Sequence, residues 1–145
     1  MPSPLPIEPH AELFAHGADI GVRGIGPTPA AAFEQAALAL TRAVTDPARI
    51  ALQTAIDIVC EAPNDTLLLV DWLNALIYEM AVRRLVFGRF AVEIKDQRLQ
   101  GKAWGEQVNR RRHSPAVEPK GATLTALEVK KRNDGAWIAQ CVVDV

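Results

Sequence analysis

The sequence has little cysteine and lacks the common motifs of catalytic and metal centres. Its two cysteines, Cys60 and Cys141, lie in separate apolar runs rather than in a close pair, so we expect two free, buried thiols. No glycine-rich phosphate loop, no Cys or His pair at zinc spacing and no serine nucleophile elbow is present. The three histidines, His10, His16 and His113, are too far apart in sequence to form a local metal motif. These absences favour a protein that is not itself an enzyme.

The sequence also lacks an excess of charge and a hydrophobic N-terminal run. The formal net charge is −1, so no overall positive field draws the protein onto nucleic acid, and we expect any contact with RNA to be weak or indirect. Residues 1–10 are expected to form a flexible arm because they are rich in proline. They resemble neither a signal peptide nor a membrane anchor. We therefore expect a cytoplasmic protein that does not enter a membrane.

Residues 11–145 have the length and composition of a single globular domain, and two segments in them have the apolar spacing of helices. The first begins at Thr28, whose side chain can cap free amides, and ends before Asp46. Its apolar stripe consists of Phe33, Ala37, Leu40 and Val44. The second is capped by Asn64 or Asp65, and its broad apolar arc predicts the more deeply buried helix. This arc consists of Leu68, Leu69, Trp72, Leu73, Leu76, Ile77 and Met80.

The remaining predicted elements are strands, because apolar and polar residues alternate in them. They cover residues 12–14, 20–24, 56–61, 85–94, 99–108, 122–131 and 136–143. Asp96 and Gln97 turn one hairpin, residues 133–135 turn the last one, and residues 109–119 form a polar loop. This order of elements predicts an α+β fold in which a mostly antiparallel sheet packs against two helices.

Several segments together resemble the archease family. The sequence FAHGADIGVRG at residues 14–24 is similar to the family's opening His-Thr-Ala-Asp-Ile-Gly, with Gly17 in place of the threonine. The helical segment LLLVDWLNALIY at residues 67–78, Lys120 and the terminal Asp144-Val145 follow at similar spacings. The family's Tyr-His pair is replaced by Leu124-Thr125. The resemblance spans residues 11–145 and implies an archease-like layered α+β fold.

The resemblance also implies a function. Archeases assist the RNA ligase that joins 2′,3′-cyclic phosphate or 3′-phosphate ends of RNA to 5′-hydroxyl ends in tRNA splicing and RNA repair. That ligase uses GTP and a divalent metal, and archease promotes its guanylylation and multiple turnover. Archeases also carry a metal site of their own. We therefore expect an accessory protein whose partner is an RNA ligase, and the sequence does not define its oligomeric state.

Asp19, Asp144 and Val145 are the expected metal ligands. Taken alone, Asp19 would cap a turn and Asp144 would be a solvated end residue. Apolar and polar residues nevertheless alternate from Trp137 to Val143, so a sheet should hold the end of the sequence in place. Two carboxylates with a carbonyl or terminal carboxylate of Val145 are hard oxygen ligands. They suit calcium first, then manganese or magnesium, and they suit zinc poorly.

Lys120, Glu106 and His113 are expected on a partner or activation face. Lys120 falls at the position of the family's lysine, although a surface lysine is more often simply solvated. Glu106 either pairs with a lysine at the surface or belongs to the polar site. For Arg110–Arg112 a solvated loop is the simpler interpretation, and a contact of these arginines and His113 with RNA phosphate or an acidic partner is the alternative.

Two other functional classes compete with the ligase activator. One is a chaperone-like interaction module with other clients. The other is a metal-dependent hydrolase, because oxygen ligands can leave metal positions open to substrate. The sequence offers no nucleophile or general base beyond the expected ligands themselves, which argues against the hydrolase.

Overall fold

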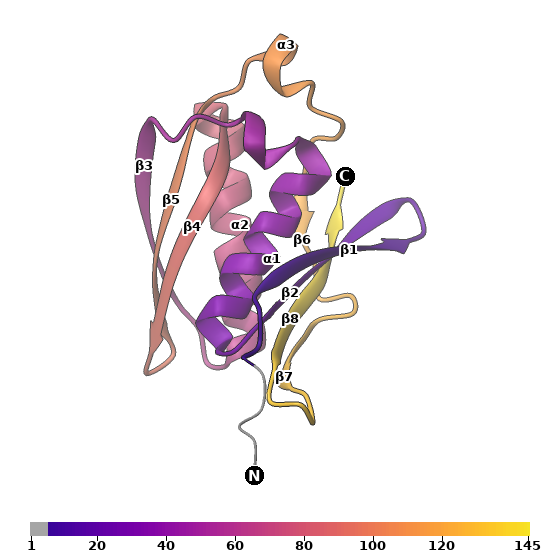
Figure 1. The fold of residues 1–145 in the computed structure, drawn as a ribbon, viewed down its shortest axis with the longest axis vertical. Coiled ribbons are helices and arrows are strands. Elements are labelled where there is room, and N and C mark those ends of the chain that lie inside the picture. Colours follow the sequence, from indigo (N-terminus) through magenta and orange to yellow (C-terminus); the bar gives the residue numbers. More distant parts are fainter. Residues whose placement is uncertain (1–5) are drawn as a thin grey trace.

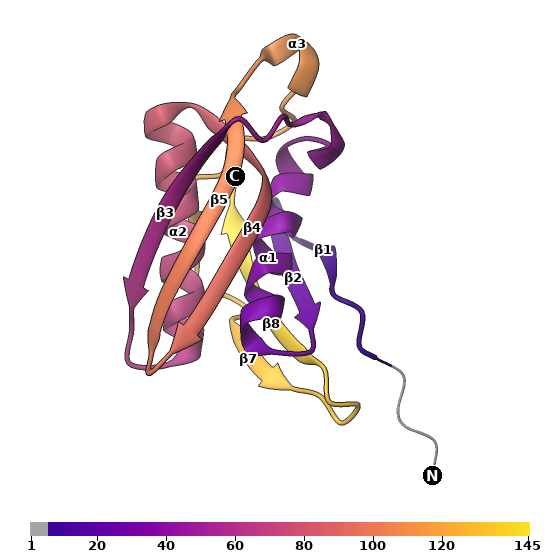
Figure 2. The same cartoon turned by 60° about the vertical axis from the view of Figure 1, so that its left-hand side comes forward.

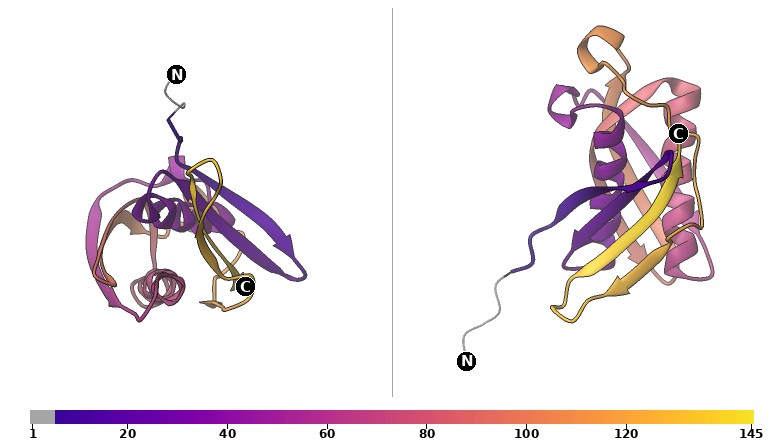
Figure 3. Two further views of the ribbon diagram at one scale, coloured as in Figure 1. Left: turned by 90° about the horizontal axis from the view of Figure 1, so that it is seen from below. Right: turned by 90° about the vertical axis from the view of Figure 1, so that its right-hand side faces the viewer.

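Two antiparallel sheets enclose the two long helices in the computed structural model, which describes residues 6–145 (Figure 1). The five-stranded sheet has the order β1-β2-β8, and both β6 and β7 pair with the other edge of β8. Its strands are β1 (His10–His16), β2 (Asp19–Gly26), β6 (Gly121–Ala122), β7 (Glu128–Lys131) and β8 (Trp137–Asp144). The view from below in Figure 3 shows the helices between the two sheets. The predicted α+β class with antiparallel pairing is confirmed, with two sheets rather than one.

The three-stranded sheet covers the opposite side of the helices (Figure 2). It has the order β3-β5-β4, and its strands are β3 (Thr54–Glu61), β4 (Leu85–Lys95) and β5 (Arg98–Gln107). A short 3-10 helix, Pro47–Arg49, precedes β3. Within residues 6–145, no helix is both long enough and apolar enough to cross a membrane.

The helix caps follow the predictions. Helix α1 (Pro29–Val44) begins after Thr28, whose hydroxyl accepts a hydrogen bond from the amide of Ala31 at 3.1 Å. Helix α2 (Asp65–Arg83) begins after Asn64, whose side-chain oxygen accepts one from the amide of Leu67 at 2.9 Å. The caps satisfy amides that have no partner inside the helix, and they fix where each helix starts.

The expectation that α2 is the more buried helix is wrong. Only Arg42 of α1 is exposed, because this helix packs against strands of both sheets. Helix α2 instead exposes Tyr78 and Val82, with 62% and 61% of their surface accessible. Gly24 of β2 allows the close approach, because a side chain at this position would overlap the carbonyl oxygen of Ala32 on α1. A broad apolar arc therefore did not indicate the deeper position.

Most strand boundaries shift by one or a few residues, and three segments differ more clearly from the sequence prediction. Residues 1–5 of the predicted arm lie outside the described residues, residues 6–9 are neither helix nor strand, and β1 already begins at His10. The expected strand 122–131 is broken into β6 and β7, because residues 123–127 leave the strand conformation and Ala126 has φ +53°. The expected loop 109–119 contains one helical turn, α3 (Arg110–His113), which is capped by Asn109.

The two cysteines are free, as predicted. Cys141 of β8 is buried, whereas Cys60 of β3 is only half-buried. Loss of solvation raises the pKa of each thiol to about 11, so both are protonated and unreactive at neutral pH.

Candidate functional site

Three strands of the five-stranded sheet, β2, β8 and β6, have ends that lie side by side. Asp19 is the first residue of β2 and Asp144 is the last residue of β8. The antiparallel pairing of these two strands ends at the residues adjacent to the two aspartates. On the other side of β8, Gly121 of β6 lies opposite Asp144. The amide of Lys120 donates to the carbonyl oxygen of Asp144 at 2.8 Å. We call Asp19, Lys120, Asp144 and Val145 the strand-end site.

Asp19 contacts the last residue of the sequence directly. The amide of Val145 donates to Oδ1 of Asp19 at 3.3 Å, although the two residues are 126 positions apart. Gly17 makes this possible, because its φ of +59° allows the tight turn between β1 and β2 that presents Asp19. The right-hand view of Figure 3 shows the end of β8 next to this hairpin. The structure thus brings together two of the three expected metal ligands, with the third adjacent in the sheet.

The oxygen atoms of the strand-end site are suited to a hard divalent cation. Of the two carboxylates, only Oδ1 of Asp19 accepts a hydrogen bond within residues 6–145, and neither forms an ion pair there. Asp19 is half-buried and Asp144 is exposed, so both can reach a ligand from solvent. No group of three or more His, Cys, Asp or Glu side chains is arranged to bind a metal in the described chain. A cation here would therefore also need main-chain oxygens, such as those of Val145.

Asn74 fixes the third strand of the site, and sequence analysis did not identify it. Its side-chain oxygen accepts a hydrogen bond from the amide of Ala122 at 2.8 Å, and its side-chain nitrogen donates to the carbonyl of Ala122 at 3.4 Å. The two bonds tie β6 to α2 and so hold Lys120, two residues earlier, beside Asp144. A polar residue in the middle of the apolar segment LLLVDWLNALIY was the available signal.

Glu106 and His113 lie in a separate cluster that is buried. Nε2 of His113 is 3.1 Å from Oε2 of Glu106, and the amide of Ala51 donates to the same oxygen at 2.7 Å. Arg112 donates to the other carboxylate oxygen. The side chain of His113 is fully buried and that of Glu106 is 6% exposed. We call Glu106 and His113 the buried cluster, which Arg112, with a 50% exposed side chain, contacts from the surface.

The hydrogen bonds define the protonation of this cluster. The amide of Asn109 donates to Nδ1 of His113 at 2.8 Å, so Nδ1 carries no proton and Nε2–H donates to Glu106. The bond from Ala51, together with His113 and Arg112, lowers the pKa of Glu106 below its ordinary value, against the opposing effect of desolvation. The charge of Glu106 is thus used inside the protein. It is not an exposed partner of a lysine, which was one of the two expected roles.

The structure does not join the expected partner residues into one surface. Lys120 is exposed at the strand-end site, whereas Glu106 and His113 are buried. His113 is instead linked to α1, because the hydroxyl of Thr45 donates to its carbonyl oxygen. Any influence of Glu106 and His113 on a partner must therefore act through the position of α3 and the chain after it.

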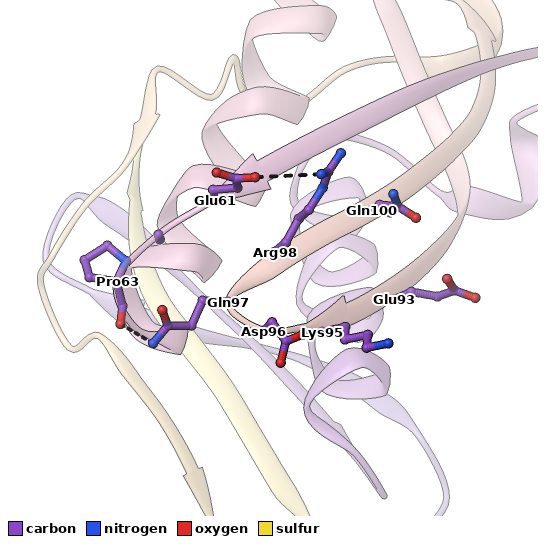
Figure 4. Close-up of a pocket in the computed structure, with 9 residues that line it drawn as sticks. Glu61, Pro63, Glu93, Lys95, Asp96, Gln97, Arg98 and Gln100 are labelled. Carbon is purple, nitrogen blue, oxygen red and sulfur yellow. Dashed lines mark hydrogen bonds and ion pairs between the residues drawn. The ribbon is translucent and has the colours of Figure 1, made fainter.

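A hollow lies at the opposite end of the molecule, around the turn between β4 and β5 (Figure 4). It has a volume of about 780 Å³, and it is open to solvent. Asp96 and Gln97 form the turn with φ of +52° and +62°, and the side chain of Gln97 donates to the carbonyl of Pro63 at 2.7 Å. Acidic, basic and amide side chains alternate around it, and none of the expected site residues lines it.

Comparison with known proteins places the chain in a family. Residues 12–145 match the model of the Archease protein family (MTH1598/TM1083). The chain is 39% identical to Protein archease of Pyrococcus furiosus over 138 residues, which are 92% of this chain and 97% of that protein. It is 37% identical to Protein archease of Methanosarcina acetivorans, and the match covers 92% of this chain and 94% of that protein.

A solved structure agrees with the sequence matches. The solution structure of Methanobacterium thermoautotrophicum protein 1598 superposes with a TM-score of 0.77 at 29% identity, covering 93% of this chain and 98% of that one. Sequence and fold therefore agree along nearly the whole length of both chains. The chain belongs to the archease family.

Proposed function

We propose that this protein activates an RNA ligase that joins 3′-phosphate or 2′,3′-cyclic phosphate ends of RNA to 5′-hydroxyl ends in tRNA splicing and RNA repair. In this proposal it promotes guanylylation of the ligase by GTP and so permits multiple turnover. Membership of the archease family supports the proposal. The structural observation that carries it is the strand-end site, where Asp19 contacts Val145 and Lys120 is bonded to Asp144.

The strand-end site would hold a divalent cation, with calcium the first candidate and manganese or magnesium the alternatives. Asp19, Asp144 and the main-chain oxygens of Val145 would be the ligands, because carboxylate and carbonyl oxygens are what these cations prefer. When bound, the cation supplies concentrated positive charge that stabilises negative charge on phosphoryl oxygens. The three strands hold the ligands in place before any partner arrives.

Lys120 would act with this site on the partner. Its backbone is fixed by the bond to Asp144 and its side chain is exposed, so its ammonium group can approach an anionic centre on another protein. Preorganised charges stabilise developing charge without a cost of reorientation at the moment of reaction. Guanylyl transfer concentrates negative charge on phosphate oxygens of the ligase complex. Lys120 would stabilise that charge, while the chemistry itself belongs to the ligase.

The test is ligation of RNA with 3′-phosphate and 5′-hydroxyl ends by limiting ligase from the same organism, with GTP and a divalent metal. The wild-type protein should raise the multiple-turnover yield although it ligates nothing alone. Asp19→Ala should abolish the effect, and Lys120→Gln should reduce the rate of turnover about tenfold, which corresponds to about 1.4 kcal/mol. Lys95→Gln is the matched control, because Lys95 is exposed at the opposite end and should be dispensable.

Equal yields with wild-type protein, with Asp19→Ala and without any addition would refute the proposal. Such a result would favour the chaperone-like interaction module. Full activation by Lys120→Gln would refute the role of Lys120 alone, because the variant keeps the backbone bond to Asp144 and changes only the charge.

A further inference from the structure

A groove of about 360 Å³ lies between the C-terminal part of α2 and the chain that follows α3. Helix α2 forms one wall with Ile77, Met80 and Ala81, and Val117 lies in the opposite wall. The floor includes Val86, which belongs to a small hydrophobic cluster separate from the main core. The groove therefore has an aliphatic floor, whereas polar and apolar groups contribute about equally to the surface that it exposes to solvent. Tyr78 and Val82 of the same helix are also exposed.

The wall opposite α2 has no regular secondary structure of its own, yet it is held at several points. The amide of Ala116 donates to the carbonyl of Val44 at 2.8 Å, and the amide of Lys120 donates to that of Asp144 at 2.8 Å. At its start, His113 is fixed by the buried cluster. A wall fixed at both ends and in the middle makes the groove preorganised, so a ligand would lose little affinity to ordering it.

The rim of the groove carries positive charge. Arg84 and Arg110 line it, both are exposed, and neither forms an ion pair with any of residues 6–145. Glu118 is the acidic residue of the lining, and Arg111 next to Arg110 is also exposed. The rim therefore has a net positive charge and complements an acidic partner.

The chemistry of the floor distinguishes a protein from RNA. The described lining of the groove contains no aromatic residue, so a base that entered it would have no ring on which to stack there. An aliphatic side chain from a protein matches the floor, and carboxylates on either side of it match Arg84 and Arg110. Pro119 also lines the groove, and Lys120 follows it directly. A protein seated in the groove is thereby brought beside the strand-end site.

We propose that this groove docks an acidic segment of the partner protein that inserts an aliphatic side chain between Ala81 and Val117. The partner is the RNA ligase, so this inference rests on the proposed function. Docking here positions the ligase against Lys120 and the strand-end site. Glu106 and His113 are positioning residues in this arrangement, because they fix the wall without touching the partner.

The test measures the Kd between the purified ligase and fluorescently labelled protein. Ala81→Glu places a charge in the groove and Arg110→Glu reverses a rim charge, and each should raise the Kd about tenfold or more. The matched controls are Ala91→Glu and Lys95→Glu, exposed positions on β4 with the same charge changes, which should leave the Kd unchanged. Melting temperatures within about 2 °C of wild type confirm that each variant is folded, since these are exposed positions.

The ligation assay separates this inference from the proposed function. Ala81→Glu should activate poorly at low concentration and fully at saturating concentration, because its strand-end site is intact. If the wild-type protein activates the ligase normally and both groove variants bind it with unchanged Kd, the docking role of the groove is wrong and the proposed function still stands. No wild-type binding or activation would overturn both. If Arg110→Glu binds a labelled 3′-phosphate RNA oligonucleotide more weakly than wild type but binds the ligase equally well, the groove is a nucleic-acid site. That result would also overturn the inference.

Discussion

The two polar clusters of this protein differ in how completely their charges are satisfied. In the buried cluster, both oxygens of Glu106 and both ring nitrogens of His113 have partners inside the protein. In the strand-end site, the only bond to a carboxylate among residues 6–145 is the one from Val145 to Asp19. A saturated cluster has no capacity left for a ligand, so it stabilises structure. The unsaturated one is where a ligand can bind.

The largest expected effect is a loss of stability when the buried cluster is disrupted. His113→Ala removes a buried ring with bonds to Glu106 and Asn109, and it should cost about 3 kcal/mol of unfolding free energy. For a chain of this length that lowers the melting temperature by about 9 °C. His16→Ala, at the exposed end of β1, is the control and should change it little. Thermal unfolding measures both, and equal melting temperatures would contradict the structural role.

A smaller effect is expected at the boundary of the strand-end site. Asn74→Ala removes the two bonds that hold Ala122, and we expect a loss of about 1.5 kcal/mol. Hydrogen exchange should show faster exchange of the Ala122 amide. Asn74→Asp keeps the acceptor for that amide and should protect it better than alanine does. Unchanged exchange in Asn74→Ala would show that other contacts hold β6.

The smallest effect at neutral pH concerns the ionisation of Glu106. Folding lowers its pKa, so the stability from its ionised form is present above the ordinary value of 4.5 and is lost as pH falls through the lowered value. Glu106→Gln lacks this contribution. The difference in unfolding free energy between wild type and Glu106→Gln, measured by denaturant unfolding, should therefore become smaller as the pH falls from 7 to 3. A constant difference would contradict a charged Glu106 in the buried cluster.

Local patterns in the sequence predicted most of the fold. Thr28 and Asn64 cap the helices as expected, because a cap depends only on residues a few positions away. The relative burial of the helices could not be predicted in this way. It depends on how closely β2 approaches α1, and this distance is set by the contact of Gly24 with Ala32. The break between β6 and β7 likewise involves Val142 of β8, whose carbonyl accepts a hydrogen bond from the amide of Thr123 and whose amide donates one to the carbonyl of Thr125.

The candidate site was predictable to the extent that its residues lie at strand ends. Alternation in β8 indicated a fixed end, and the contact between Asp19 and Val145 follows from it. The partners of Glu106 could not be inferred, because Ala51, Arg112 and His113 converge from a loop and from α3. Asn74 was missed because an amide in a helix shows its function only when the strand that it bonds is known.

The most direct test of the division between the two clusters is calorimetric titration with calcium and with manganese. Wild-type protein should bind one cation, Asp19→Asn should bind none, and His113→Ala should still bind although it unfolds more easily. This result would place ligand binding in the strand-end site and stability in the buried cluster. Unchanged binding in Asp19→Asn, or binding lost in folded His113→Ala but kept in Asp19→Asn, would contradict the account.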